Sequence, residues 1–351
     1  MHCVGFAFER AGGGFQRVEY ELAPGADEVV VEVAGCGLCH TDIGFYYGEV
    51  APRRALPLVL GHEIAGTVVE VGAACATWRG ARVIVPAVMP CDACPNCRAG
   101  FPNTCRRQLM PGNDAHGGFA THVLVPARHL AKLPADLRGH ELADLSVIAD
   151  AVTTPYQSIA RAGVGPADVA IVIGVGGIGT YGVQIAKARG AKVIAIDIDP
   201  AKLERIREHG ADRAIDVRGM DLKAARAAVR KAVEELEGRD FAWKLFEMSG
   251  SKPGQEMAFH LLPPSGTLAI VGFTPAKVEL RLSNLMAFDA TCFGNWGCAP
   301  EHYAQAIGLV LDGRVRVEPF VKRYPLADLE PLFEAAHHGA LRERPVLIPQ
   351  L

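Results

Sequence analysis

The sequence has no excess of charge of either sign, no block of like charges and no long apolar run. Its 36 Lys and Arg nearly balance 39 Asp and Glu, giving a net charge of −3 in 351 residues, so nothing in it attracts nucleic acid or an anionic membrane in general. No window holds the roughly 18 uninterrupted apolar residues of a membrane span. The opening MHCVGFAFERAGGG lacks the basic and then apolar segments of a secretory signal. We therefore expect a soluble cytoplasmic protein with neither nucleic acid nor a membrane as a partner.

The length and texture of the chain predict two domains. Half of the residues are apolar, enough for sizeable cores. The first 150 residues or so contain short β-like runs broken by turn residues, as in a compact, mostly β domain; they lie at 28–33, 64–71, 82–85 and 121–125. After Pro155 the pattern changes to an apolar strand at 169–173, a helical stretch at 178–189 and a second apolar strand at 192–196. This alternation predicts an α/β domain with a parallel, Rossmann-type sheet.

Four of the ten cysteines have the spacing of a structural zinc site. Cys91, Cys94, Cys97 and Cys105 follow a C-x2-C-x2-C-x7-C pattern, which lets four thiolates surround one tetrahedral cation and leaves no open position. Pro95, Gly100 and Pro102 suit a loop that wraps a metal. The alternatives are a disulfide knot or thiols that cluster by chance, but a chain without a secretory signal favours reduced thiols.

The glycines of GVGGIG predict a dinucleotide-binding loop. They directly follow the apolar run AIVI and open a helix, where a backbone without side chains and a helix N-terminus can approach a pyrophosphate. The residues expected to bind it are Gly174, Gly176, Gly177, Ile178 and Gly179.

An acid at the end of the next strand predicts the choice of coenzyme. The Asp197 carboxylate is placed to accept hydrogen bonds from the adenosine ribose and to repel a 2′-phosphate, which favours NAD over NADP. Asp197 could instead cap the helix of DIDPAKLE, and Asp199 could take either role. Lys202 is expected to add a ribose contact.

Further metal-binding residue types lie upstream of the zinc-site cysteines. Cys39 in GCGLCHTD and His62 in LGHE can supply a thiolate and an imidazole from separate loops. Two ligands are too few for an open catalytic zinc, which needs three protein ligands and a water or substrate oxygen. From the residues alone, the third ligand stays open among Asp, Glu, Cys and His.

These motifs together resemble the zinc-dependent medium-chain alcohol dehydrogenases over essentially the whole chain. The stretches that carry the resemblance are GCGLCHTD, LGHE, the four-cysteine lobe, GGFATHVLVP and VIGVGGIG. The resemblance implies an NAD-dependent alcohol dehydrogenase with two zinc ions per chain. It also implies a GroES-like catalytic domain at 1–153 and 295–351, with a structural zinc lobe near 90–110, and an NAD-binding Rossmann domain at 154–294. Relatives are dimers or tetramers, so we expect a homodimer or homotetramer that pairs near 291–296.

The resemblance assigns roles around the catalytic zinc. Cys39 and His62 become ligands, and Asp150 of IADAVTTPYQ becomes the third. Asp150 could instead be a turn or cap residue, which would leave Glu63 as the substitute ligand. Glu63 otherwise corresponds to an acid beside the metal ligands. Cys36 is expected in the core.

The same resemblance implies a proton path with one gap. Thr41 would pass on the proton of the alcohol, His40 would lie near the coenzyme pyrophosphate, and Asp42 would orient the His62 imidazole. Several relatives continue the path with a histidine shortly after the Thr-Asp pair, whereas this chain has Ile43, Gly44 and Phe45. His40 or water are the candidates to replace it.

Further stretches, among them TDIGFYYGEV, LMPGNDAHGGFA and GNWGC, resemble one branch of the family, the 6-hydroxycyclohex-1-ene-1-carbonyl-CoA dehydrogenases. These enzymes oxidise a ring alcohol of a CoA thioester to the 6-oxo product in anaerobic aromatic degradation, so the resemblance implies a CoA-thioester substrate. The side chains that could surround its ring or anchor its phosphates are equally ordinary core or surface residues: Phe45, Tyr46, Tyr47, Trp296, Arg53, Arg54, Lys277 and Arg281. The alternatives are an alcohol or polyol dehydrogenase acting on a free small alcohol, or an enoyl-thioester reductase. A non-enzymatic NAD-binding zinc protein is disfavoured, because an open three-ligand site serves catalysis.

Overall fold

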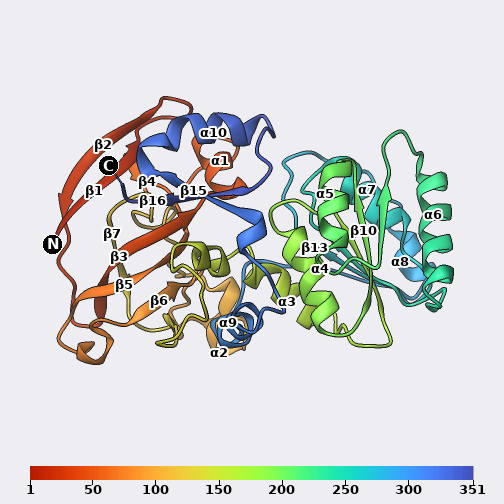
Figure 1. The fold of residues 1–351 in the computed structure, drawn as a ribbon, viewed down its shortest axis with the longest axis horizontal. Coiled ribbons are helices and arrows are strands. Elements are labelled where there is room, and N and C mark those ends of the chain that lie inside the picture. The colour runs from red at the N-terminus through yellow and green to blue at the C-terminus, as the bar shows by residue number, and fades with distance from the viewer. Residues whose placement is uncertain (351) are drawn as a thin grey trace. The chain divides into compact units, whose positions relative to one another are not determined.

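The structure, a computed structural model, describes residues 1–350, and the chain divides into two compact units (Figure 1). The first unit comprises Met1–Thr153, Gly297–Leu311 and the described residues from Val317 onward. The second comprises Thr154–Trp296 and Asp312–Arg316. Each unit has its own sheet and its own hydrophobic core. No helix among the described residues has the length and apolarity to cross a bilayer.

The first unit is built mainly of antiparallel strands. One sheet has the order β2-β1-β4, and a seven-stranded sheet has the order β15-β16-β3-β5-β6-β8, with β7 also paired to β3. The strands are β1 His2–Phe8, β2 Phe15–Glu21, β3 Glu28–Gly37, β4 Leu58–Val59, β5 Glu63–Val71, β6 Arg82–Val85, β7 His122–Pro126, β8 Ala131–Lys132, β15 Val321–Pro325 and β16 Arg344–Ile348.

Strand β3 is the centre of the larger sheet. It pairs with β5 along one edge and with β7 and β16 at opposite ends of its other edge. Because it has neighbours on both edges, its apolar run VVVEV is almost entirely buried. The ends of β3 and β5 therefore lie side by side, with Gly37 level with Glu63.

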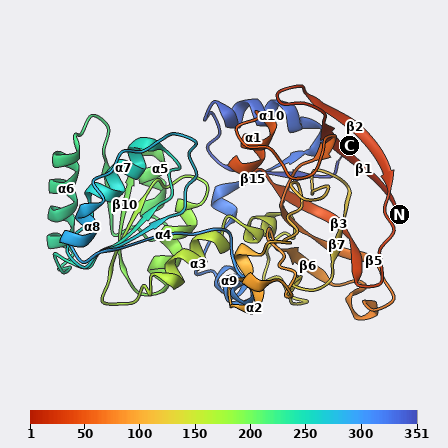
Figure 2. The same cartoon turned by 180° about the vertical axis from the view of Figure 1, so that it is seen from behind.

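Short helices cover this sheet, and helix α1 begins where β3 ends. Helix α10 packs against α1, as both views show (Figures 1 and 2). The α-helices are α1 His40–Tyr46, α2 Pro95–Arg98, α9 Tyr303–Leu311 and α10 Leu329–His337. The 3-10 turns are η1 Ala76–Trp78, η2 Pro102–Thr104, η3 Asp144–Ala149, η4 Pro300–His302, η5 Glu318–Phe320 and η6 Leu326–Asp328.

The second unit is a six-stranded, fully parallel sheet in the order β11-β10-β9-β12-β13-β14, which confirms the predicted Rossmann-type sheet. Its strands are β9 Val169–Ile173, β10 Lys192–Asp197, β11 Arg213–Asp216, β12 Lys244–Glu247, β13 Thr267–Ile270 and β14 Thr291–Gly294. Its helices are α3 Thr153–Arg161, α4 Gly179–Ala188, α5 Pro200–Arg207, α6 Leu222–Glu235, α7 Lys252–His260 and α8 Ser283–Ala287. The strand order reverses between β9 and β12, and such a switch point is where open α/β sheets bind ligands.

Candidate active site and metal centres

One buried carboxylate organises the start of helix α1. Asp42 is fully buried, and its Oδ2 accepts the backbone N–H of Cys39 at 3.0 Å. Its Oδ1 accepts the N–H of Gly61 at 3.1 Å and lies 3.2 Å from Nδ1 of His62. A carboxylate at Nδ1 holds the proton on that nitrogen and leaves the Nε2 lone pair for a metal.

Four side chains that can ligate a metal meet in front of α1. The ligand atoms of Cys39, His62, Glu63 and Asp150 all lie within 4.8 Å of one another. The Asp150 Oδ2 atom is 3.9 Å from Cys39 Sγ and 3.7 Å from His62 Nε2. A tetrahedral zinc with ordinary bond lengths would separate such atom pairs by about 3.4 to 3.6 Å. The buried Nε2 of His62 has no hydrogen-bond partner in the described chain, so these residues fit a zinc ion.

The position of Asp150 depends on a buried tyrosine. Asp150 ends the 3-10 turn η3, which packs against β5. The Tyr303 hydroxyl donates to the carbonyl of the preceding residue, Ala149, at 2.6 Å, and accepts the N–H of Ala87 at 3.3 Å. Tyr303 therefore ties helix α9 to the backbone that carries Asp150. Sequence reasoning did not find this residue.

One carboxylate oxygen of Glu63 is occupied by a buried arginine. Its Oε1 accepts Nη1 of Arg344 at 2.8 Å, and the same Nη1 donates to the Leu38 carbonyl at 3.1 Å. Its Oε2 is buried without a partner in the described chain and lies where a side chain on Gly37 would be, only 2.1 Å from a Cβ built there. Gly37 therefore makes the space for this carboxylate. Arg344 was also missed, because it lies 281 positions from Glu63 and has no motif around it.

The electrostatics of the cluster favour a cation. Burial raises the pKa of Glu63 to about 7, although the Arg344 guanidinium opposes the shift. Burial pushes the pKa of His62 down, but the carboxylates of Asp42 and Asp150 outweigh it and hold that pKa well above its usual value. Both raised pKa values mean that His62 and Glu63 retain protons, and hence positive or neutral charge, inside a cluster of acidic side chains. A divalent cation could supply that positive charge in place of the protons.

Of the other residues expected near this site, one lies beside the Cys39 thiol, one is exposed and three lie in the hydrophobic core. Thr41 is half-buried on α1, with its Oγ1 3.8 Å from Cys39 Sγ, while His40 is exposed. Cys36 lies in the hydrophobic core, as expected. Phe45 and Tyr46 also belong to that core, because they pack inward from α1.

The four-cysteine lobe forms a compact second cluster on α2 and η2. Sγ of Cys94 lies 3.5 Å from Sγ of Cys97 and 3.7 Å from Sγ of Cys105, close to the spacing of about 3.8 Å that Zn–S bonds of 2.3 Å impose in a tetrahedron. Backbone N–H groups of Cys97 and Arg106 lower the pKa of Cys94 to about 6. All ten cysteines are free thiols, so the disulfide alternative is wrong and the lobe fits a closed zinc site.

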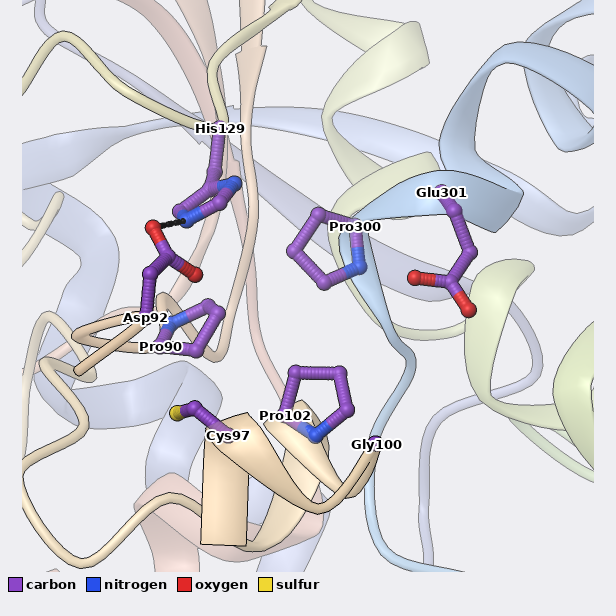
Figure 3. A pocket seen from close by; sticks show the side chains of 8 residues that line it. All are labelled: Pro90, Asp92, Cys97, Gly100, Pro102, His129, Pro300 and Glu301. Atoms are coloured by element: carbon purple, nitrogen blue, oxygen red, sulfur yellow. Dashed lines mark hydrogen bonds and ion pairs between the residues drawn. The ribbon is translucent and has the colours of Figure 1, made fainter. Parts of the chain in front are cut away.

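A pocket of about 490 Å³ lies beside this lobe (Figure 3). Its lining contains none of the residues of the Cys39 cluster: Pro90, Asp92, Cys97, Gly100, Pro102, His129, Pro300 and Glu301. On one wall, Nε2 of His129 lies 2.7 Å from Oδ2 of Asp92. This pair connects the lobe to the segment between β7 and β8, which is a structural role for His129.

The glycine loop lies between β9 and α4, as predicted. Gly174 follows β9 in the left-handed region, with φ 84°, and Gly179 begins α4. A Cβ on Gly179 would lie 1.8 Å from the Gly174 carbonyl oxygen, so only glycine allows this turn. At Gly176 a Cβ would meet nothing within 4 Å, which leaves the space open that a coenzyme pyrophosphate would need. Gly177 and Ile178 complete the loop between Gly176 and Gly179.

The two aspartates after β10 have separate roles. Asp199 is the N-cap of α5, where its side chain accepts the N–H of Ala201 at 2.9 Å, so the cap interpretation belongs to Asp199. The Asp197 carboxylate accepts the N–H of Val175 in the glycine loop at 2.7 Å and that of Ile198 at 2.7 Å. Lys202 is partly exposed in the first turn of α5.

The four basic residues considered as anchors for the phosphates of coenzyme A are divided between the two units. Two of them have other partners in the first unit, and two are exposed in the second unit. Arg53 pairs with Asp114 at 3.3 Å, and Arg54 lies 3.3 Å from Nε2 of His116. Lys277 and Arg281 are exposed side chains of the second unit, which also carries Trp296, 48 % exposed.

Comparisons with known proteins agree with this architecture. Residues 25–135 match the family model of the alcohol dehydrogenase GroES-like domain, and residues 177–312 match that of the zinc-binding dehydrogenases. An alcohol dehydrogenase of Geobacillus stearothermophilus is 30% identical over 322 residues, 91% of either chain. L-galactonate-5-dehydrogenase of Escherichia coli is 29% identical and covers 89% of this chain and 88% of its own. The crystal structure of the Aeropyrum pernix alcohol dehydrogenase superposes with a TM-score of 0.88 at 28% identity, over 99% of this chain and 100% of the other.

A mostly β unit with two clusters of metal-binding side chains and a Rossmann-type unit define a metal-dependent dehydrogenase of the medium-chain type. The chain belongs to the zinc-dependent medium-chain alcohol dehydrogenase family. It is therefore an oxidoreductase whose cofactors are zinc and a nicotinamide coenzyme.

Proposed function

We propose that the protein oxidises a free small alcohol or polyol, with NAD as the hydride acceptor and one catalytic zinc held by Cys39, His62 and Asp150. The observation that carries the proposal is the buried cluster of thiol, imidazole and carboxylate in which His62 Nε2 has no other partner. The four-cysteine lobe would hold the second, structural zinc.

The geometry favours Asp150 over Glu63 as the third ligand. Asp150 Oδ2 lies under 4 Å from both Cys39 Sγ and His62 Nε2. One oxygen of Glu63 is already engaged by Arg344, and the other lies over Gly37. Glu63 is therefore the carboxylate beside the ligands, placed to balance the charge of the site.

The mechanism assigns a task to each part of the chain. When bound, zinc acts as a Lewis acid that lowers the pKa of the substrate hydroxyl. Asp42 keeps the His62 imidazole and the Cys39 backbone in place, and Thr41 Oγ1 would accept the proton of the substrate hydroxyl. The nicotinamide coenzyme would take up the hydride. The glycine loop would hold the coenzyme, with Asp197 and Lys202 at its ribose, and the family resemblance assigns His40 to its pyrophosphate. The chain supplies orientation and electrostatics, and the coenzyme supplies the redox chemistry.

A CoA thioester is the less supported substrate. The relatives compared above are named for an alcohol and for L-galactonate. Arg53, which the resemblance offered as a phosphate anchor, is paired with Asp114, and Phe45 and Tyr46 are core residues. The CoA branch is supported only by the short sequence stretches that resemble it, so we retain it as a second candidate. An enoyl-thioester reductase is supported still less, because it has no use for the Cys39 cluster.

We also propose that two copies of the chain pair along β14. This strand is the last of its sheet, so its outer edge has no strand partner among the described residues, and three of its four residues are exposed. Exposed apolar side chains lie near it in the sequence, among them Met286 and Trp296. An open, partly apolar edge is a template for pairing with a second copy.

The experiment is a screen for NAD reduction with free secondary alcohols and polyols beside cyclic hydroxyacyl-CoA thioesters. We expect turnover with the free substrates, two zinc ions per chain, and loss of one zinc together with activity in Cys39→Ser. Cys75→Ser, which replaces a thiol of the first unit outside both clusters, serves as the control and should retain both. Turnover with only the thioesters would reverse the choice of substrate. Unchanged zinc and activity in Cys39→Ser would overturn the metal assignment.

A further inference from the structure

The position where some relatives carry a second proton-transfer residue is empty on α1. Gly44 lies three residues after Thr41, so the two share one face of the helix. A Cβ built on Gly44 would meet a single group within 4 Å, the carboxylate oxygen Oε2 of Glu49 at 3.7 Å. The space beside Thr41 that a longer side chain at position 44 would fill is therefore bordered by a carboxylate from further along the chain.

The end of helix α1 places Glu49 there. Gly48 adopts a left-handed conformation with φ 79°. Its N–H donates to the Phe45 carbonyl at 3.3 Å, and the N–H of Glu49 donates to the Gly44 carbonyl at 2.9 Å. These two bonds form a Schellman motif, in which the residue after the left-handed glycine folds back over the last turn of the helix. The turn thus brings Glu49 over the backbone of Gly44.

The Glu49 side chain has no structural task that competes with this placement. It is exposed and makes no hydrogen bond or ion pair with another described side chain. His40, the other candidate for the missing histidine, directly precedes Thr41, and adjacent residues of a helix do not face each other. Glu49 therefore combines a position on the Thr41 face with direct access to solvent.

We propose that Glu49 receives the proton that leaves through Thr41, in the place that a histidine takes in several relatives. The proposal rests on the alcohol dehydrogenase activity inferred above. Side chains three residues apart on a helix have Cβ atoms about 5 to 6 Å apart, and Oε2 of Glu49 lies 3.7 Å from the Cβ position of residue 44. We therefore assign the span between Thr41 and Glu49 to water.

The carbinol carbon gives a hydride to NAD, and the hydroxyl gives its proton to Thr41 Oγ1. The proton of Thr41 moves through water to a carboxylate oxygen of Glu49, and the protonated Glu49 releases it to bulk water. The products are a carbonyl compound, NADH and one proton.

The test measures proton release directly. Protein is mixed with NAD and the best alcohol from the screen in weak buffer with a pH indicator, in a stopped-flow instrument. In Glu49→Gln and Glu49→Ala we expect proton release and turnover about 10²-fold slower than in the wild type, the lower end of what acid-base groups contribute. Zinc content, thermal stability and NADH affinity should not change, because the Glu49 side chain touches neither the metal-binding cluster nor the glycine loop and makes no hydrogen bond or ion pair within the described chain. Glu141→Gln, another exposed glutamate of the same unit, is the matched control and should behave as the wild type.

Rescue separates proton transfer from a structural role. Formate should restore much of the rate in Glu49→Ala, where it can occupy the vacated space, and little in Glu49→Gln. Gly44→His in the Glu49→Ala background should restore the rate without formate. A wild-type rate of proton release in Glu49→Gln would overturn the proposal while leaving the dehydrogenase assignment intact. Absence of NAD reduction by the wild type with every alcohol and thioester would overturn both.

Discussion

Nδ1 of His62 lies 3.2 Å from Oδ1 of Asp42, although the two residues come from different segments of the chain. The other oxygen of the same carboxylate accepts the backbone N–H of Cys39. One buried acid therefore fixes the tautomer of the imidazole and the backbone of the thiol. Because His62 and Cys39 both present N–H donors to Asp42, the site requires a side chain at this position that only accepts hydrogen bonds.

We expect Asp42→Asn to weaken the catalytic metal site by about 10- to 100-fold, the usual cost of losing a partner of a metal ligand. The asparagine amide would present N–H groups to donors that now meet oxygens. Competition with a chromophoric zinc chelator measures the change, and only one of two zinc ions should be affected. Asp240→Asn, at an exposed position of the second unit, is the control. Equal chelator resistance in Asp42→Asn and the wild type would contradict the prediction.

The cysteine lobe should contribute to folding and not directly to the reaction. In Cys94→Ser a closed set of four thiolates loses one member, and the free energy of zinc binding is lost from the folded state. We expect one zinc per chain, a lower melting temperature and reduced yield, with the coenzyme unable to restore the melting temperature. Metal analysis and calorimetry on the same sample measure both effects. A variant that keeps two zinc ions and its melting temperature would show that the lobe holds no metal.

Features set by residues close together in the sequence could be predicted from local spacing, whereas contacts between distant residues could not. The cysteine lobe, the glycine loop and the parallel sheet follow from residues close in sequence, whose geometry is set by short turns. The pairing of Glu63 with Arg344 joins a strand near the start of the chain to its last strand, and no pattern around Arg344 indicates it. Phe45 and Tyr46 looked equally suited to a pocket or a core, since only the packing against α10 distinguishes the two. The placement of Glu49 could be predicted only in part. Gly48 indicates that the helix ends there, but the sequence does not show that the side chain of the next residue folds back toward Gly44.

Asp197 should set the coenzyme preference. In Asp197→Asn the side chain can still accept the N–H of Val175, but the negative charge that repels a 2′-phosphate is gone. We expect NAD to bind about 10-fold more weakly and the gap between NAD and NADP to narrow, as measured by fluorescence titration with NADH and NADPH. Asp199→Ala, which removes the cap of α5, should cost about 1 kcal/mol of stability and leave the coenzyme ratio unchanged. Equal affinity of the wild type for both coenzymes would show that Asp197 does not face the ribose.

Glu247 should make the stability of the second unit depend on pH. It is fully buried at the end of β12, where its Oε1 accepts the N–H groups of Ser249 and Gly250 and its Oε2 has no partner in the described chain. Burial raises its pKa in the folded state, although the bonds from Ser249 and Gly250 oppose the shift. The protonated form is favoured on folding, so its stabilisation is complete below the unfolded pKa of about 4.3 and is lost as the pH rises through the folded value.

A neutral side chain at this position should remove that dependence. We expect the melting temperature of Glu247→Gln to rise relative to the wild type between pH 5 and pH 8, because glutamine has no charge to bury. Glu208→Gln, at an exposed position of the same unit, controls for the general loss of one negative charge. A difference between Glu247→Gln and the wild type that stays constant with pH would contradict the prediction.

Thr41→Val tests whether the hydroxyl beside the Cys39 cluster carries the substrate proton. Valine has nearly the shape of threonine, so the packing of this half-buried position and the cluster geometry should survive, with two zinc ions and normal NADH affinity. If Thr41 accepts the proton, turnover should fall by about 10²- to 10⁴-fold, and removing Glu49 in the same chain should cost little more, because a path already broken at its first member cannot be broken again. If Thr41 only packs, the variant should change stability and leave the rate nearly unchanged, and the effects of the two substitutions should multiply. Steady-state kinetics on the two single variants and the double variant, with zinc analysis of each, distinguishes the two outcomes.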